Sequence, residues 1–377
     1  MSISIIPETA DAEMREVRVG IIGCGGIANG KHLPSLSKLP NVKLVAFCDL
    51  IEEKAEKAKE DFGTEDAGVY TDYRKLLEQE NIEVVHVLTP NASHCELSVA
   101  ALNAGKHVMC EKPMATTYEE AQKMVEASRT SGKYLTVGYQ TRSSQGHQYV
   151  RHMVERGELG EIYYIKAPSI RKRGVPLWGV FLDKEQQGGG PMIDIGTHSI
   201  DAALSLIGNY DVVSVTGSVY RKLADTAYQS NEWGIWDPET LAFNVEDSAM
   251  AYIRFRNGAT MIVEAAWLLN YAGDSHMTLC GTKGGVEFLP EGKVRFCGET
   301  DGSFYTKDVT PGTSARDLFK GQSLTAEEYE AKQWIYSIVH QIPPLTKPEE
   351  AAVVSRIIEA VYRSAEEGRT IFFDDVQ

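Results

Sequence analysis

The sequence predicts an α/β protein with two domains, of which the first is built on a doubly wound parallel sheet and the second on a large, open and mostly antiparallel sheet. Three observations predict this fold class. The chain has 377 residues, more than one ordinary core holds. Strand and helix patterns alternate over the first 140 residues, and strand patterns separated by turns dominate after about residue 145.

In the first part, short apolar runs alternate with helical patterns. Such nearly continuous apolar runs are typical of strands buried on both faces of a parallel sheet. Thr117 with Glu120 forms a capping box at one helix start. The expected strands are 17–23, 42–48, 82–88, 107–110 and 134–139, and the expected helices are 51–62, 92–104 and 117–131.

In the second part, Asn257-Gly258 between two alternating runs predicts a hairpin. The expected strands are 162–170, 212–220, 248–255, 260–267, 286–288 and 294–297. The expected helices are 146–156, 191–207, 326–340 and 348–367. We therefore expect an N-terminal arm over residues 1–16, a first domain over 17–141 and a second domain over 142–377.

The composition indicates which classes of partner and which cell compartment to expect. The formal net charge of −15 argues against nucleic acid or an anionic membrane as the main partner. No apolar stretch reaches the roughly 20 residues that a membrane span needs. The six cysteines are scattered without a C-x-x-C pair, and residues 1–16 lack the pattern of a secretory signal. We expect a cytoplasmic protein with free thiols.

A glycine-rich turn follows the first expected strand and opens a helix. Its pattern is G-x-G-x-x-A, which in this context is typical of a Rossmann dinucleotide-binding domain. The first glycine permits the turn, the second lets backbone approach a pyrophosphate, and the helix N-terminus favours phosphate charge. The residues expected to contact the cofactor here are Gly23, Gly25, Gly26, Ile27 and Ala28.

Asp49 ends the second strand, about 20 residues beyond the turn, where a carboxylate that binds the ribose 2′-hydroxyl belongs. A carboxylate at this place repels a 2′-phosphate, so we expect NAD rather than NADP. The alternative interpretation is that Asp49 only caps the helix that starts near Ile51.

Polar residues follow three further strands. Ligands of open parallel sheets bind beyond the carboxyl ends of the strands, so these residues are expected at the same crevice. The candidates for cofactor contact are Thr89, Pro90, Asn91, His94, Glu111, Lys112 and Gln140. Lys112 is also a catalytic candidate, because an ammonium at a strand end can stabilise a developing alkoxide. The alternative is a surface lysine in a loop.

Behind Gly188-Gly189-Gly190-Pro191, the expected helix carries Asp194, His198 and Asp201 at spacings that share one face. A histidine can accept an alcohol proton near neutral pH, and a carboxylate can hold the substrate or tune the imidazole. Two alternative interpretations of Asp194 and His198 remain. They could be solvated residues on the helix surface, or they could bind a divalent metal. H-E-x-x-H is absent and no third ligand is evident, so no metal is expected.

Together these residues resemble the glucose–fructose oxidoreductase, inositol dehydrogenase and MocA family over nearly the whole chain. The segments that carry the resemblance are GCGGIA at 23–28, TPNASH at 89–94, AGKHVMCEKP at 104–113, GYQTR at 138–142 and GGGPMIDIGTHSID at 188–201. The resemblance implies a Rossmann domain followed by an α/β domain whose open sheet mediates homo-oligomers. It also implies a catalytic triad of Lys112, Asp194 and His198, with the histidine as general acid/base and the other two binding the reacting hydroxyls.

The expected activity is hydride transfer between NAD and a secondary hydroxyl of a sugar, glycoside or inositol-type polyol. Besides the triad, the candidates for substrate contact are Arg142, Arg171 and Trp178, with Arg173 and His147 as further ones; a structural role is an alternative for each. Two other functions stay open. One is an NAD-dependent glycosidase that oxidises its sugar transiently, and the other is a non-enzymatic sugar sensor on the same fold.

Overall fold

The computed structural model describes residues 15–226, 230–237, 242–273, 275–312, 319 and 322–373. Residues 1–14 of the expected N-terminal arm lie outside these described residues. The chain divides into two compact units. The first comprises Met1–Ser143 and Arg316–Ala352, and the second comprises Ser144–Ala315 and Val353–Gln377. The unit with the glycine turn thus includes 316–352, a segment that the sequence places in the second domain.

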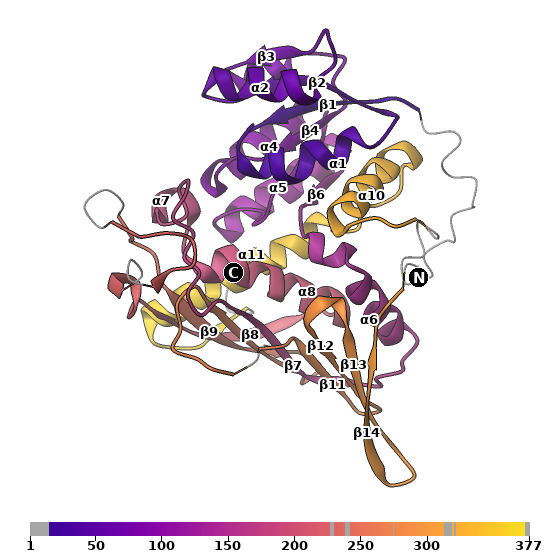
Figure 1. Ribbon diagram of the computed structural model, residues 1–377, viewed down its shortest axis with the longest axis vertical. Helices are drawn as coiled ribbons and strands as arrows, with labels where there is room; N and C mark the ends of the chain where they lie inside the picture. The colour runs from indigo at the N-terminus through magenta and orange to yellow at the C-terminus, as the bar shows by residue number, and fades with distance from the viewer. Residues whose placement is uncertain are drawn as a thin grey trace. The chain divides into compact units, whose positions relative to one another are not determined.

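The first unit contains a parallel sheet of six strands in the order β3-β2-β1-β4-β5-β6, which confirms the predicted fold class (Figure 1). This is the strand order of dinucleotide-binding domains. The strands are β1 (Val17–Ile22), β2 (Val42–Cys48), β3 (Gly68–Tyr70), β4 (Val84–Val87), β5 (His107–Cys110) and β6 (Leu135–Val137). Of these, β3 was not predicted, because its three residues make no apolar run.

Helices connect these strands, and most begin and end where local signals place them. At the start of α5, the Thr117 side chain accepts a hydrogen bond from the Glu120 amide, and the helix ends at Gly132 in the left-handed conformation (φ 67°). The helices of this unit are α1 (Leu33–Ser37), α2 (Glu52–Phe62), α3 (Tyr73–Leu77), α4 (His94–Asn103), α5 (Tyr118–Ser131) and α10 (Ala326–His340), with a π turn at Ala28–His32 and short 3-10 turns at Asn91–Ser93 and Gln140–Ser143.

The core of the first unit explains why a late segment of the chain belongs to it. Trp334, Ile335 and Ile338 on α10 are buried in the same cluster as Val19 and Leu44 of the parallel sheet. Burying such side chains is favourable by about 1.5–3 kcal/mol each. α10 therefore completes the core of the nucleotide-binding unit, although residues 144–315 of the second unit separate it in sequence from β6.

The second unit is built on a sheet of nine strands in the order β14-β13-β12-β11-β7-β10-β9-β8-β15. Neighbours are antiparallel except for β7 with β10, so the sheet is mixed but mostly antiparallel. The strands are β7 (Ile162–Ile170), β8 (Val212–Tyr220), β9 (Ser248–Phe255), β10 (Thr260–Ala266), β11 (Thr278–Gly281), β12 (Gly285–Phe288), β13 (Val294–Thr300), β14 (Ser303–Val309) and β15 (Ile371–Phe372).

One face of this sheet is covered by helices, and α8 contacts both β7 and α6 (Figure 1). The helices are α6 (Gln145–Glu155), α7 (Lys184–Gln187) and α8 (Thr197–Ile207), with a further 3-10 turn at Ala224–Thr226 and another at Pro290–Gly292. α11 (Pro348–Glu367) begins in the first unit and continues into the second. The unpredicted strand β14 is exposed along almost its whole length and shows no alternation of apolar and polar residues.

The helix expected over 191–207 is interrupted. Met192–Gly196 forms a π turn, and the regular helix α8 starts at Thr197. Asp194 consequently lies in the π turn and His198 in α8. Asp201 is fully buried and Asp194 is 8% exposed, so the interpretation of Asp194 as a solvated helix residue is wrong.

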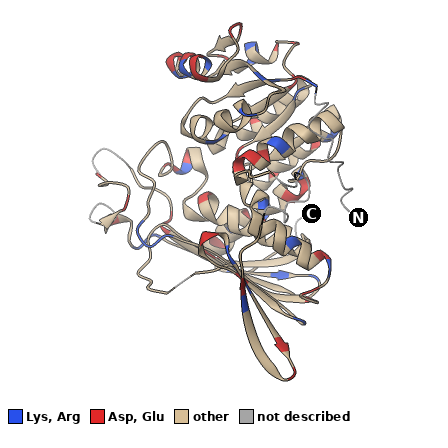
Figure 2. Cartoon of the chain, turned by 45° about the vertical axis from the view of Figure 1, so that its right-hand side comes forward, with Lys and Arg blue, Asp and Glu red and all other residues tan. Residues whose placement is uncertain are grey.

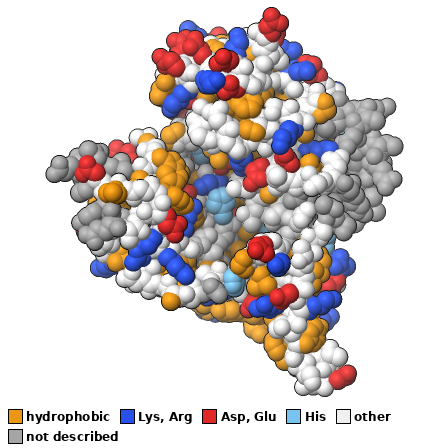
Figure 3. Space-filling view, in the orientation of Figure 1, with side chains coloured by type: hydrophobic (Ala, Val, Ile, Leu, Met, Phe, Trp, Pro, Cys, Tyr) orange, Lys and Arg blue, Asp and Glu red, His pale blue; other side chains and the backbone are white. Residues whose placement is uncertain are grey.

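Charged side chains of both signs mix along the surface helix α2, where acidic and basic residues alternate (Figure 2). The face seen in Figure 3 likewise carries red and blue side chains side by side over the α2 region. In the part of the chain that the structure describes, no helix is long and apolar enough to span a membrane.

Candidate functional site

The glycine turn after β1 has the geometry that close contact with a ligand requires. Gly23 has a φ of +95°, and a Cβ there would collide with the carbonyl of Leu88, so only glycine fits. A Cβ added to Gly25 or Gly26 would meet no atom within 4 Å among the described residues. Glycine at these two positions is thus not needed for packing inside the protein. It leaves the turn's backbone open to a group from outside.

Asp49 connects the end of β2 to this turn. Its Oδ2 accepts a hydrogen bond from the Cys24 amide at 2.8 Å, and its Oδ1 accepts one from the Ile51 amide at 2.9 Å. Ile51 is itself the N-cap of α2 (Glu52–Phe62), so the second contact closes the turn before the helix and does not cap an amide of its first turn. Each carboxylate oxygen has two acceptor sites, so neither contact prevents a hydroxyl from binding as well.

His94 links the turns that follow β4 and β5. It is fully buried, with Nδ1 2.7 Å from the Pro113 carbonyl oxygen and Nε2 2.9 Å from that of Thr89. Burial lowers the pKa of His94 below its ordinary value. Both ring nitrogens face backbone oxygens, and a neutral imidazole donates from one of them, so His94 bonds to one strand-end turn and packs against the other. These contacts favour a structural role over direct contact with a cofactor.

Glu111 lies in a buried ionic network that the sequence did not predict. Its Oε1 is 2.8 Å from Lys31 Nζ and 2.8 Å from His32 Nε2, and Lys31 Nζ is 2.9 Å from Glu330 of α10. Burial disfavours the ionised form of Glu111, but Lys31 and His32 hold its pKa well below the ordinary value. Burial likewise opposes the charge of Lys31, whose pKa the two carboxylates nevertheless raise.

This network reaches Lys112, because Glu111 Oε2 accepts a hydrogen bond from the Lys112 amide at 3.0 Å. Glu111 thus fixes the backbone from which the Lys112 side chain extends. One sequence signal was available for the network, namely the polar pair Lys31-His32 directly after the glycine turn. His86, in the apolar strand β4, also contacts His32, with their Nδ1 atoms 3.1 Å apart.

In the second unit, Asp194 is the centre of a buried polar cluster. Its Oδ2 accepts a hydrogen bond from Trp267 Nε1 at 3.1 Å and lies 3.7 Å from Arg171 Nη1. Trp267, directly after β10, is fully buried, whereas Arg171 is about one-third exposed. His198 lies one turn further on, in α8, and is partly exposed.

The triple glycine before Asp194 has a structural cause. Glu246 accepts hydrogen bonds from the amides of Gly190 (2.8 Å) and Met192 (3.2 Å) and from the Tyr362 hydroxyl (2.9 Å). A Cβ on Gly190 would collide with the Glu246 backbone. Burial raises the pKa of Glu246 above its ordinary value. Glu246, which the sequence did not single out, therefore anchors the start of the segment that carries Asp194 and His198.

The candidates for substrate contact separate into two groups. Arg142 is buried and pairs with Glu350 at 2.6 Å inside the first unit, and His147 is buried with Nε2 2.9 Å from Ser205 Oγ. These contacts favour structural roles. Arg171 and Trp178 keep exposed surface. The Arg173 guanidinium contacts Ser230, Asn270 and the carbonyl oxygens of Lys172 and Leu269.

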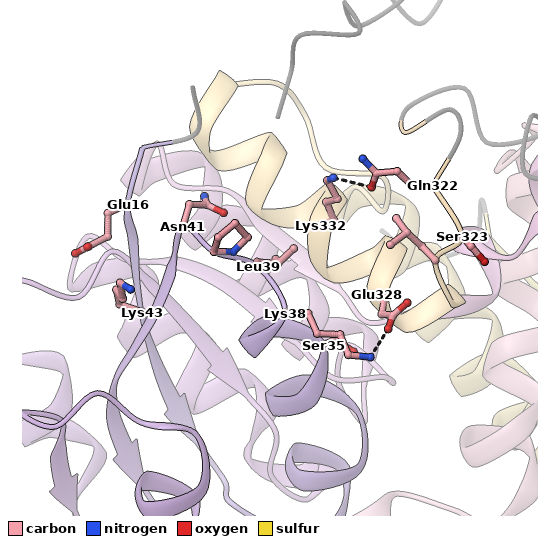
Figure 4. A pocket seen from close by; sticks show the side chains of 12 residues that line it. Glu16, Ser35, Lys38, Leu39, Asn41, Lys43, Gln322, Ser323, Glu328 and Lys332 are labelled. Atoms are coloured by element: carbon pink, nitrogen blue, oxygen red, sulfur yellow. Dashed lines mark hydrogen bonds and ion pairs between the residues drawn. The ribbon is translucent and has the colours of Figure 1, made fainter. Parts of the chain in front are cut away.

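One cavity, of about 780 Å³, is lined by other residues (Figure 4). It lies in the first unit and is lined by residues from 16–43 and 322–332. Lys38 pairs with Glu328 across it, and Lys332 donates to Gln322 at 2.8 Å. None of the predicted site residues lines it. Two of its lysines, Lys38 and Lys332, are paired with polar partners of this chain, and we assign no ligand to this cavity.

The residues present fit a dinucleotide. The backbone at Gly25 and Gly26 is open, and Asp49 stands at the end of the neighbouring strand. In addition, Gln140 Oε1 is buried and finds no hydrogen-bond partner among the described residues. A buried polar atom without a partner is costly unless a bound group supplies one.

Fold and site together define an NAD-binding oxidoreductase. Residues 17–139 match the family described as "Oxidoreductase family, NAD-binding Rossmann fold", and residues 147–287 match the "GFO/IDH/MocA C-terminal domain". The chain is 35% identical over 357 residues to D-glucoside 3-dehydrogenase of Escherichia coli, covering 94% of this chain and 97% of the relative. The chain therefore belongs to the GFO/IDH/MocA oxidoreductase family, as the motifs indicated, and NAD is its cofactor.

Other relatives extend the comparison. Myo-inositol 2-dehydrogenase of Thermotoga maritima is 26% identical over 363 residues, which cover 96% of this chain and 99% of that enzyme. Among solved structures, levoglucosan dehydrogenase in complex with NADH and levoglucosan superimposes with a TM-score of 0.81 at 23% identity, covering 95% and 99% of the two chains. An oxidoreductase domain protein from Kribbella flavida gives the same TM-score at 24% identity. These structural likenesses establish the fold.

Proposed function

We propose that this oxidoreductase transfers a hydride between NAD and a secondary hydroxyl of a sugar, glycoside or inositol-type polyol. The observation that carries the proposal is the buried carboxylate of Asp194, held by Trp267 and Arg171 one turn from His198. Relatives named as glucoside and inositol dehydrogenases support this substrate class.

The cofactor contacts are part of the proposal. The amides of the turn from Gly23 to Ala28 would hold the pyrophosphate, since a helix N-terminus favours phosphate charge. Asp49 would accept from the ribose hydroxyls, and Gln140 Oε1 would accept from a donor of the bound group. When bound, NAD supplies a nicotinamide ring that accepts hydride from a carbon bearing a hydroxyl.

The catalytic roles follow from the chemistry of the side chains. His198 accepts the proton of the reacting hydroxyl, and Asp194 accepts a hydrogen bond from a neighbouring hydroxyl. The Lys112 ammonium donates to the reacting oxygen and stabilises its developing negative charge. Lys112 belongs to the first unit, and Asp194 and His198 belong to the second.

The first experiment is absorbance at the reduced-nicotinamide band, with NAD and a panel of glucosides, anhydrosugars, aldoses and inositols. We expect a rise with one group of epimers, which locates the reacting hydroxyl. Release of free sugar and aglycone without net reduction of NAD would show that the protein is a glycosidase that oxidises its sugar transiently, and not a dehydrogenase. Tight binding of a sugar with neither change would point to a sensor.

We also propose that the chain forms homo-oligomers through the open face of its large sheet. Tyr220, Met250 and Tyr252 are each about 40% exposed there, and Tyr220 Oη lies 3.8 Å from Met250 Sδ. Exposed apolar side chains that gather on a sheet are typical of an interface. We expect Tyr252→Glu to reduce the mass measured by light scattering, while Glu60→Lys on α2 leaves it unchanged.

A cytoplasmic location is proposed on the state of the cysteines. All six lie in described segments and are free thiols. Free thiols persist in a reducing compartment.

A further inference from the structure

Two tryptophans of the second unit keep large parts of their rings exposed. Trp178 is 53% exposed and Trp233 is 42% exposed, and their rings meet edge to face with centroids 5.2 Å apart and planes at 64°. The ring of Phe181 packs edge to face against Trp178, with ring centroids 6.0 Å apart and planes at 72°. Leaving two indoles in contact with water forgoes the free energy that burial would provide, and such a patch marks a binding surface.

The backbone holds this pair in place. The Asn231 side chain donates to the Val175 carbonyl oxygen at 3.1 Å and accepts from the Val175 amide at 2.7 Å. The Glu232 amide donates to the Arg173 carbonyl oxygen at 3.1 Å. The segment that ends at Trp233 is therefore tied to the segment that leads to Trp178. A wall that is fixed before binding costs little ordering when a ligand arrives.

Arg171 joins this wall to the reacting centre. Its guanidinium carbon lies 4.8 Å from the centroid of a Trp233 ring, and its Nη1 lies 3.7 Å from Asp194 Oδ2. One guanidinium thus bridges the proposed hydroxyl-binding carboxylate and the exposed indole. The group carries five N–H donors in a planar fork, so it can also donate to hydroxyls of a ligand.

We infer that Trp178, Trp233 and Arg171 form a subsite for a second ring attached to the sugar that is oxidised. The substrate is then a glycoside whose aglycone is itself a ring, either a sugar or an arene. The flat apolar face of that ring packs on the indoles, while Arg171 donates to oxygens near the glycosidic bond. This inference rests on the proposed function, since it extends the site around Asp194 outward by one ring.

The test compares phenyl glucoside, a glucosyl disaccharide and methyl glucoside as both anomers. In Trp233→Ala we expect the ratio of kcat/KM for phenyl over methyl glucoside to fall about 5- to 10-fold, mostly through KM, because an aromatic contact contributes on this scale. Trp233→Phe should restore most of the ratio. Ile235→Ala, an 82% exposed neighbour outside the wall, serves as the control and should keep it. A fall with the disaccharide alone assigns the subsite to a sugar ring.

If Trp233→Ala changes kcat/KM relative to methyl glucoside for neither phenyl glucoside nor the disaccharide, the subsite is overturned, as it is by an equal loss for ring and methyl aglycones. Failure of the dehydrogenase proposal is recognised separately, by tryptophan fluorescence titration. Suppose that no glycoside reduces NAD, but wild-type protein binds phenyl glucoside more tightly than methyl glucoside and Trp233→Ala loses this preference. The subsite is then supported, although the dehydrogenase proposal has failed. If wild-type protein binds neither phenyl glucoside nor the disaccharide more tightly than methyl glucoside, the subsite is wrong.

Discussion

Trp267 Nε1 donates a 3.1 Å hydrogen bond to Asp194 Oδ2, although 73 positions separate the two residues. Trp267 directly follows β10 of the large sheet, and Asp194 lies in the π turn before α8. The bond fixes a carboxylate that would otherwise choose among rotamers, and it satisfies an indole that is fully buried.

Replacing this donor tests whether Asp194 must be held. In Trp267→Phe we expect kcat/KM for the best sugar to fall about 10-fold or more, since a hydrogen bond to a charged group contributes about 1.5–3 kcal/mol. The matched control is Trp334→Phe. Trp334 is equally buried, and its Nε1 has no partner among the described residues. Equal losses in the two variants would show that only packing matters at Trp267.

Removing the proposed base tests the proton transfer. His198→Ala should lower kcat by about 10²–10⁴-fold, because general acid/base groups contribute on that scale. The affinity for NAD, measured by calorimetry, should stay within about twofold of wild type. His340→Ala, at the exposed end of α10, is the control. Normal turnover by His198→Ala would remove His198 from the mechanism.

Cofactor choice depends on the charge at Asp49. Asp49→Asn keeps an oxygen that can accept from the Cys24 or Ile51 amides but loses the charge that repels a 2′-phosphate. We expect the ratio of kcat/KM for NAD over NADP to fall at least about 10-fold, the effect of roughly 1.4 kcal/mol. Asp61→Asn, an exposed position on α2, should leave it unchanged. An unaltered ratio in Asp49→Asn would show that the charge of Asp49 does not discriminate between NAD and NADP.

Glu111 should link stability to pH. Its pKa in the folded protein is depressed: burial opposes this, but Lys31 and His32 outweigh burial. A carboxyl of this kind stabilises the fold above its unfolded pKa of about 4.3 and loses that contribution as the pH falls through the folded pKa. Glu111→Gln should therefore lower Tm at pH 7, since breaking a buried ion pair costs about 3–5 kcal/mol.

The difference in Tm between wild type and Glu111→Gln should narrow as the pH falls below about 4, which circular dichroism melts would follow. Asp61→Asn breaks an exposed pair with Lys57 and should change Tm little at any pH. A difference that stays constant from pH 7 to pH 3 would mean that ionisation of Glu111 contributes nothing to stability.

Local signals were sufficient for most elements of the fold. The predicted bounds hold for β2, β5, β7, β8, β9, α10 and α11, where an apolar run or a clear period marks the element. The strands that were missed, β3, β11, β14 and β15, are short or exposed, so no apolar pattern marks them. Residues 316–352 join the first unit through the core around Trp334, a long-range contact that no local pattern reveals.

The sequence by itself determined the glycine turn, the acidic residue 20 or more positions later, and the Lys112, Asp194 and His198 candidates. Each of these depends on residue type at a short, regular spacing. Only the tertiary structure decided what surrounds them: Trp267 beside Asp194, Glu246 beneath Gly190, and Lys31 with Glu330 around Glu111. These partners are brought together by strand pairing and core packing, so their separation in sequence carries no information about their contact in space.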